Sequence, residues 1–131
     1  MDTPHTPFIT FVGQRHQADC GVATLAMLCG VSYEDALLAI GSKQVLTNGV
    51  ALKVVRDAAR KLGKRLVLHR HIDPDNDTGI LGVKSPSWHF EHLVVLKEGI
   101  IIDPQDQTIW DLDSYIAAHQ AQAVSLLALK D

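Results

Sequence analysis

The spacing of apolar residues changes at Gly63, and this change constrains the fold more than any other feature of the chain. Before Gly63, apolar side chains recur every three or four residues, as they do on one face of a helix. After Gly63, runs such as residues 65–69 alternate with period two, which is typical of strands. Helices followed by antiparallel strands predict an α+β fold. We expect one domain over residues 1–131, since this length can bury a sizeable core unaided.

Capping residues and glycines set the expected limits of the helices. Three helices are predicted, over residues 20–29, 33–40 and 50–62. Their expected N-caps are, in order, Asp19, Ser32, and Thr47 or Asn48, and their expected stops are Gly30, Gly41 and Gly63. Before the first helix, residues 1–7 contain two prolines and are expected to form a flexible arm, and residues 8–12 form a short β-type run.

The second half of the chain is expected to form most of the sheet. The predicted strands are residues 65–69, 80–83, 93–96, 100–102 and 124–129. Residues 73–79 are a turn or loop rich in Asp, and residues 110–113 lead into a helix that ends near Ala121. Lys97-Glu98-Gly99 joins two apolar runs as a hairpin turn.

Cys20 lies in the first turn of the first predicted helix, directly after Asp19. A thiol there is close to unpaired backbone N–H groups and the positive end of the helix dipole, and both favour the thiolate. A buried cysteine that packs as a small apolar side chain fits the same stretch. Cys29 follows nine residues later, roughly 13 Å along the helix axis, which is too far for a disulfide. Two free thiols suit a reducing compartment, so we expect a cytoplasmic protein.

The hairpin brings a histidine and an aspartate together. If its turn is centred on Glu98 and Gly99, Lys97 faces Ile100 and position 94 faces Asp103. His92 and Asp103 then become diagonal neighbours on one face of the sheet, within reach of a hydrogen bond. Cysteine chemistry needs such a base and benefits from a third group that orients it. His89 has the opposite parity and is expected to point away from Asp103.

Three blocks of the sequence resemble the bacteriocin-processing, double-glycine-type family of papain-like cysteine peptidases. The first block is Gln14, five intervening residues, and Asp19-Cys20-Gly21 followed by an Ala/Leu-rich run. The second is the central helix of residues 50–62 with its glycine ending. The third is His92-Leu93-Val94-Val95 with the later Asp103-Pro104 pair, and together the blocks cover most of residues 11–104.

The resemblance implies a papain-like cysteine peptidase fold, with N-terminal helices packed on an antiparallel sheet. It implies that Cys20 is the nucleophile, His92 the general acid and base, and Asp103 the group that orients His92. Gln14 is then the oxyanion-hole donor alongside the backbone N–H of Cys20; an acyl-transfer oxyanion needs such donors. Gln17 is nearer to Cys20 but fits the spacing of the family less well.

The leading interpretation is therefore a cysteine peptidase or isopeptidase that cleaves a peptide or amide bond in a peptide or protein substrate. The same triad also serves enzymes of amide transfer or deamidation, including transglutaminase-like ones, because the acceptor is chosen by the groove. A non-catalytic domain that binds a peptide or protein on the same fold is a third interpretation. The sequence does not indicate the oligomeric state.

Charge and composition exclude several other classes of protein. The formal net charge of -3 and the lack of a Lys/Arg run give no attraction for nucleic acid. No apolar run approaches the length of a membrane span, and no signal peptide is recognisable. His69, His71 and His89 lack the Cys/His spacing of a structural zinc site, and residues 73–77 lack the closing Glu of a calcium loop. We expect no metal and no other cofactor.

Overall fold

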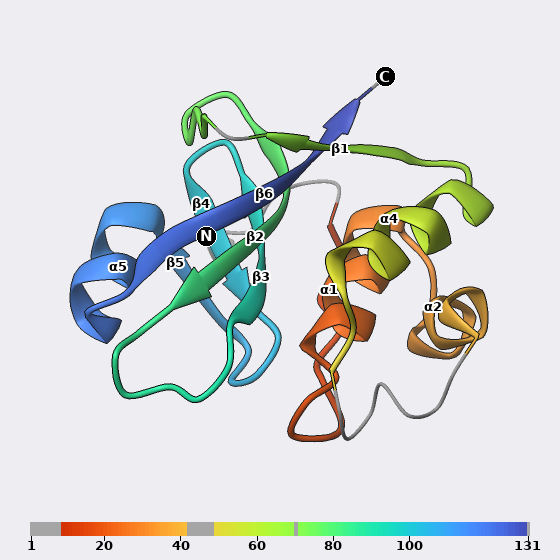
Figure 1. Cartoon of the computed structure of the whole chain (residues 1–131), viewed down its shortest axis with the longest axis horizontal. Coiled ribbons are helices and arrows are strands. Elements are labelled where there is room, and N and C mark those ends of the chain that lie inside the picture. Colours follow the sequence, from red (N-terminus) through yellow and green to blue (C-terminus); the bar gives the residue numbers. More distant parts are fainter. Residues whose placement is uncertain (1–8, 42–48, 70, 131) are drawn as a thin grey trace, which may run out of the picture.

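The computed structural model describes residues 9–41, 49–69 and 71–130. Helices α1, α2 and α4 lie together on one side of a sheet, and α5 lies on the other side (Figure 1). The helices are α1 Cys20–Cys29, α2 Tyr33–Ile40, α4 Leu52–Lys61 and α5 Leu112–His119. The strands are β1 Arg65–His69, β2 Thr78–Lys84, β3 His92–Lys97, β4 Ile100–Asp103, β5 Thr108–Asp111 and β6 Gln122–Lys130. The chain therefore has the expected α+β content.

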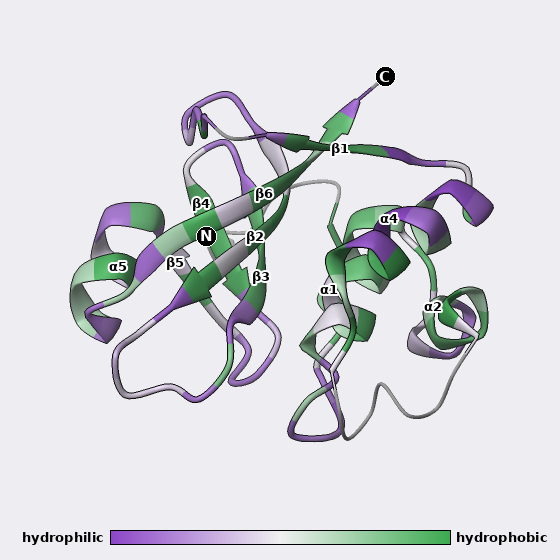
Figure 2. Cartoon of the chain, viewed as in Figure 1, coloured by the Kyte–Doolittle hydropathy of each residue, from purple (hydrophilic) through white to green (hydrophobic). Residues whose placement is uncertain are grey.

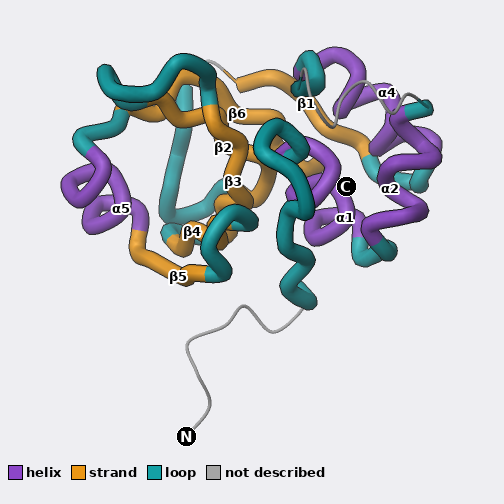
Figure 3. The backbone as a smooth tube through the Cα atoms, turned by 90° about the horizontal axis from the view of Figure 1, so that it is seen from below, coloured by secondary structure: helices purple, strands orange, loops and turns teal. Residues whose placement is uncertain are grey.

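The strands form one antiparallel sheet of six strands in the order β1-β6-β2-β3-β4-β5. Strands β2 to β5 follow one another as neighbours, but the last strand, β6, lies between β1 and β2. Figure 3 shows the curved sheet between α5 and the group of α1, α2 and α4. Strand β6 thus connects β1, which packs against α4, to the rest of the sheet.

Apolar side chains cover both faces of the sheet. Ile80 and Leu93 join the core between the sheet and the three N-terminal helices, where α1 packs against β2 and β3, and α4 packs against β1. The alternate residues Leu81 and Val94 join a second core on the opposite face, under α5. Figure 2 shows the green of hydrophobic residues concentrated along the strands and α1. Strands buried on both faces explain why their sequences read as nearly continuous apolar runs.

Helix α1 has the predicted limits, and Gly30 ends it with a φ of 68°. Its N-terminus differs from the prediction, because the Asp19 side chain makes no capping hydrogen bond to the helix. Ser32 does cap α2, accepting a hydrogen bond of 3.0 Å from the backbone N–H of Asp35. The Ser32 cap fixes where α2 starts, whereas the start of α1, and with it the position of Cys20, is not set by a side-chain cap.

Three sequence predictions were wrong in part. Residues 9–12 form no strand; Ile9, Phe11 and Val12 instead pack irregularly over a small core around Met27. Helix α4 begins two residues later than predicted, because residues 49–51 are not helical. Strand β5 occupies residues where only the approach to a helix was expected. The predicted arm of residues 1–7 and the predicted caps Thr47 and Asn48 lie outside the described residues.

Candidate active site

The β3–β4 hairpin has the predicted register, with Lys97 paired to Ile100. Glu98 and Gly99 both adopt positive φ angles, of 49° and 86°. This combination is the type I′ geometry, whose twist matches that of the flanking strands. As a result, His92 at the start of β3 meets Asp103 at the end of β4, and His92 Nε2 lies 2.8 Å from Asp103 Oδ1. The predicted histidine–aspartate contact is present.

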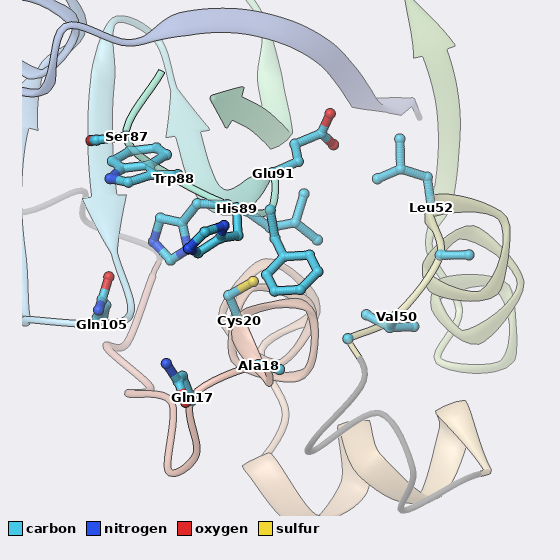
Figure 4. A pocket seen from close by; sticks show the side chains of 15 residues that line it. Gln17, Ala18, Cys20, Val50, Leu52, Ser87, Trp88, His89, Glu91 and Gln105 are labelled. Atoms are coloured by element: carbon cyan, nitrogen blue, oxygen red, sulfur yellow. The ribbon is translucent and has the colours of Figure 1, made fainter. Parts of the chain in front are cut away.

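Cys20 joins this pair from the first turn of α1, close enough to His92 for its side chain to help raise the pKa of the ring. Since Nε2 of His92 faces Asp103, Nδ1 is the ring nitrogen left for the sulfur. Figure 4 shows Cys20 rising from α1 toward the segment that carries Trp88 and His89. Cys20, His92 and the residue after Pro104, Gln105, all line one cleft of about 850 Å³. Cys20 is only partly buried and lines the cleft, so a substrate bound there can reach it.

The electrostatics of the pair favour a charged imidazolium. Burial lowers the pKa of His92, but its hydrogen bonds with Asp103 and Cys20 and the charge of Asp103 raise it to about 9. Burial raises the pKa of Asp103, and hydrogen bonds from His92 and from the backbone N–H of Gln105 bring it below its ordinary value. The attraction between the buried carboxylate and the buried imidazolium offsets part of the cost of removing both charges from water.

The carboxylate of Asp19 organises the loop before Cys20 instead of capping α1. It is fully buried and accepts hydrogen bonds from the backbone N–H groups of Arg15 at 2.9 Å and His16 at 3.0 Å. The Tyr33 hydroxyl of α2 also donates to it. Asp19 thus holds the loop of residues 15–19 closed against α2, and the chain reaches Cys20 in a fixed direction.

Gln14 lies on the same loop but does not reach the cleft lining. Its Nε2 donates to the backbone carbonyls of His16 at 2.9 Å and Gln17 at 3.3 Å. Its Oε1 is buried and has no hydrogen-bond partner among the described residues. Gln17 does line the cleft, and Figure 4 shows its side chain directed into it. Of the four residues singled out in the sequence, Cys20, His92 and Asp103 therefore meet; the backbone N–H of Gln14 bonds the carbonyl of Pro104, next to Asp103, at 3.0 Å, but its side chain is turned to the loop carbonyls.

Apolar side chains form much of the cleft walls on both sides of Cys20. Val50, before α4, and Leu52, its first residue, lie on one side of the cleft, and Trp88 lies on the other (Figure 4). Phe90 also lines the cleft. Phe90 is 81% exposed, so its ring is open to a ligand in the cleft. An open groove with apolar walls and a few polar groups is typical of a site for a peptide or small organic ligand.

Sequence reasoning missed one side chain at this site. Tyr115 of α5 is fully buried, and its hydroxyl donates to Asp103 Oδ2 at 2.9 Å. Nothing local in the sequence indicates this contact, because the two residues are twelve positions apart and strand β5 lies between them.

Of the remaining candidates, only His89 shares the cleft with Cys20 and His92. Cys29, at the other end of α1, is a free thiol whose pKa is raised to about 11 by burial. His69 Nδ1 lies 3.9 Å from Asp77 Oδ2, and His89 lines the cleft. Within the described ranges, no group of three or more His, Cys, Asp or Glu side chains is placed to hold a metal ion. No described helix is long and apolar enough to span a membrane alone; only α1 and α2 together reach the length, with a bend of 112° between them.

Comparison with known proteins identifies the fold. The structure is similar to the crystal structure of a double glycine motif protease from an AMS/PCAT transporter, determined in complex with the leader peptide. The TM-score is 0.63, the match covers 94% of this chain and 92% of that chain, and the sequence identity is 20%. No protein-family model and no curated protein matches the sequence. The chain thus has the fold of double-glycine peptidases, as its motifs indicated, and this level of identity establishes the fold alone.

Proposed function

We propose that this protein is a cysteine peptidase that cleaves peptide bonds with Cys20, His92 and Asp103. The observation that carries the proposal is the position of the His92 ring, which bonds Asp103 Oδ1 through Nε2 at 2.8 Å and lines the same cleft as Cys20, whose side chain helps raise the pKa of the ring. Nucleophile, base and orienting group in this order are the requirements of thiol catalysis. The open cleft with apolar walls supports a peptide as the substrate.

The proposed reaction begins from an ion pair in which His92 already holds the proton as an imidazolium and Cys20 is a thiolate. The thiolate attacks the carbonyl carbon of the scissile bond, and the carbonyl π electrons move to oxygen. The oxyanion collapses, the C–N bond breaks, and the His92 imidazolium gives its proton to the departing amine nitrogen. Water, deprotonated by His92, then attacks the thioester, and the acid product leaves with Cys20 restored.

The oxyanion needs donors, and two are proposed. The backbone N–H of Cys20 is at the first position of α1, where N–H groups have no partner within the helix. The second donor is the Gln14 side chain, for which one amide hydrogen must leave the carbonyl of His16 or Gln17 when substrate binds. Such a rearrangement on substrate binding is common, because catalytic hydrogen bonds often tighten only in the complex.

We infer a peptide substrate of the kind that such folds accept. The similar protease was solved with a leader peptide, which supports a peptide segment as the occupant of this cleft as well. Two thiols on one helix, too far apart to pair, suit a reducing compartment, and we propose that the protein acts in the cytoplasm.

Incubation of the purified protein with a peptide pool, read out by mass spectrometry, tests the proposal. The wild-type protein and the Cys29→Ala control should cleave, and Cys20→Ala should not. Ammonia release or amide exchange without chain cleavage would assign the triad to deamidation or amide transfer. Tight peptide binding that survives Cys20→Ala, with no turnover by the wild type, would instead indicate a binding domain.

A further inference from the structure

The second oxygen of the Asp103 carboxylate has its own partner, which the proposed mechanism does not use. Oδ1 faces His92 Nε2 at 2.8 Å and accepts from the backbone N–H of Gln105 at 2.9 Å. Oδ2 accepts from the Tyr115 hydroxyl at 2.9 Å. Asp103 is only 3% exposed, so little water is available to replace a lost donor. A buried carboxylate oxygen without a donor is costly, and its orientation is then poorly fixed.

Tyr115 is held in place from three directions. Its helix α5 starts at an N-cap, Asp111, whose side chain accepts from the backbone N–H of Ser114 at 3.0 Å. The Tyr115 ring packs edge-on against the Trp110 ring, with the two centroids 5.8 Å apart. Its centroid lies 4.2 Å from that of the His119 ring. The ring is fully buried in the core under α5. The position of the hydroxyl that donates to Asp103 is therefore fixed by the packing of its ring and helix.

The hydroxyl is a stable donor in this position. Burial first, and then the charge of Asp103 and the hydrogen bond to it, raise the pKa of Tyr115 far above its ordinary value. The other charged or titratable neighbours are Asp106 and Cys20, whose charges act in the same direction, and His119, which is in ring contact. Tyr115 thus stays protonated, and its proton points to the carboxylate at every pH at which the enzyme would work.

We propose that Tyr115 is a positioning residue that extends the proposed triad into a chain of Cys20, His92, Asp103 and Tyr115. The inference rests on the proposed function, since it assigns to Tyr115 the task of holding the group that orients the general base. Tyr115 touches neither the substrate cleft nor the sulfur; it acts through Asp103. By fixing the rotation of the carboxylate, it fixes the direction in which His92 presents Nδ1 to Cys20.

The direct test is the Asp103 carboxyl itself, titrated by carbon-13 NMR in the wild type and in Tyr115→Phe, which keeps the ring. Loss of the donor should raise the pKa of Asp103 by about one unit. Tyr33→Phe is a matched control, because Tyr33 is likewise a buried tyrosine that donates to a buried carboxylate, that of Asp19. This control should leave the Asp103 titration unchanged. An unchanged Asp103 titration in Tyr115→Phe would overturn the proposal.

The second readout is the alkylation rate of Cys20 by iodoacetamide at pH 6.5, which needs no peptide substrate. Tyr115→Phe should slow it about tenfold. In an Asp103→Asn background the same change should have little further effect, because residues that act through one another are not additive. Equal slowing in both backgrounds would contradict the proposal. A wild-type Cys20 that reacts no faster than Cys29 would instead refute the proposed function.

If Tyr115→Phe does not fold, replacement of both tyrosines by 3-fluorotyrosine keeps the ring and makes the hydroxyl a stronger donor. The Asp103 pKa should then fall below the wild-type value. No change, or a rise, would count against a hydrogen bond from Tyr115 that matters at this site.

Discussion

His92 is the residue on which the proposed chemistry depends, because it bonds Asp103 and its pKa responds to both Asp103 and Cys20. Its pKa of about 9 results from Asp103 and Cys20 overcoming the effect of burial. Below that pH the ring is an imidazolium, which is the form that gives a proton to a departing amine. Cleavage should therefore decline as the pH rises through about 9.

NMR of the His92 ring gives this pKa directly. We expect a midpoint near 9 in the wild type. In Asp103→Asn the midpoint should shift toward about 6.5, the ordinary value for histidine, because the ring loses the carboxylate that stabilises its charged form. Midpoints near 6.5 in both proteins would show that the carboxylate does not control the ring.

Gln14 and Gln17 compete for the role of side-chain donor in the oxyanion hole. Gln14 has the spacing of the peptidase family, whereas Gln17 is the one that lines the cleft. We expect Gln14→Ala to lower kcat about 10²- to 10³-fold with little change in KM, as loss of an oxyanion donor does. Gln17→Ala should have only a small effect on kcat. The opposite pattern in steady-state kinetics would assign the donor to Gln17.

At the scale of elements, the loop before α1 depends on one buried carboxylate. Asp19→Ala leaves the backbone N–H groups of Arg15 and His16 and the Tyr33 hydroxyl without their acceptor. We expect a loss of about 3 kcal/mol in the free energy of unfolding, because several donors lose a charged partner. Urea denaturation of the wild type and of Asp19→Ala measures this difference in the free energy of unfolding.

Ser32→Ala is the control for Asp19→Ala, since it removes a more exposed capping hydrogen bond at α2. It should cost about 1 kcal/mol. An Asp19→Ala protein that loses no more stability than Ser32→Ala would contradict the role given to Asp19 in the loop.

The elements that local sequence defines were predicted well, and those that depend on distant partners were not. Helix α1, its Gly30 stop and the β3–β4 register follow from glycines and residue parity, which act within a few residues. Strand β5 was missed because apolar and polar side chains alternate only weakly over its four residues. It forms as a strand by antiparallel pairing with β4. Asp19 was expected to cap α1, but its carboxylate finds donors in the loop and in Tyr33, which no local pattern reveals.

At the scale of the whole molecule, the α+β class was predictable but the sheet order was not. Placement of β6 between β1 and β2 pairs the end of the chain with strands formed much earlier in the sequence, and only tertiary packing decides it. The meeting of Cys20 with the hairpin is of the same kind. Sequence motifs indicated which residues meet, and the packing of α1 against β3 brings them together.

The His92 titration also links the site to the stability of the fold. A pKa of about 9 in the folded state exceeds the value of about 6.5 expected in the unfolded chain. His92 therefore contributes stability that is fully present below pH 6.5 and is lost as the pH rises through 9, by about 3 kcal/mol at most. Urea denaturation across this range should show a decline that is smaller in His92→Gln. An equal decline in both proteins would contradict the linkage.

Site-resolved alkylation tests the central claim most directly. At pH 6.5, iodoacetamide should modify Cys20 of the wild type at least about tenfold faster than Cys20 of His92→Ala, in which the thiol has lost its imidazolium partner. Cys29, whose pKa is about 11, should remain almost unmodified in both proteins. Equal rates at Cys20 with and without His92, measured by peptide mapping, would contradict the account of a thiolate activated by this histidine.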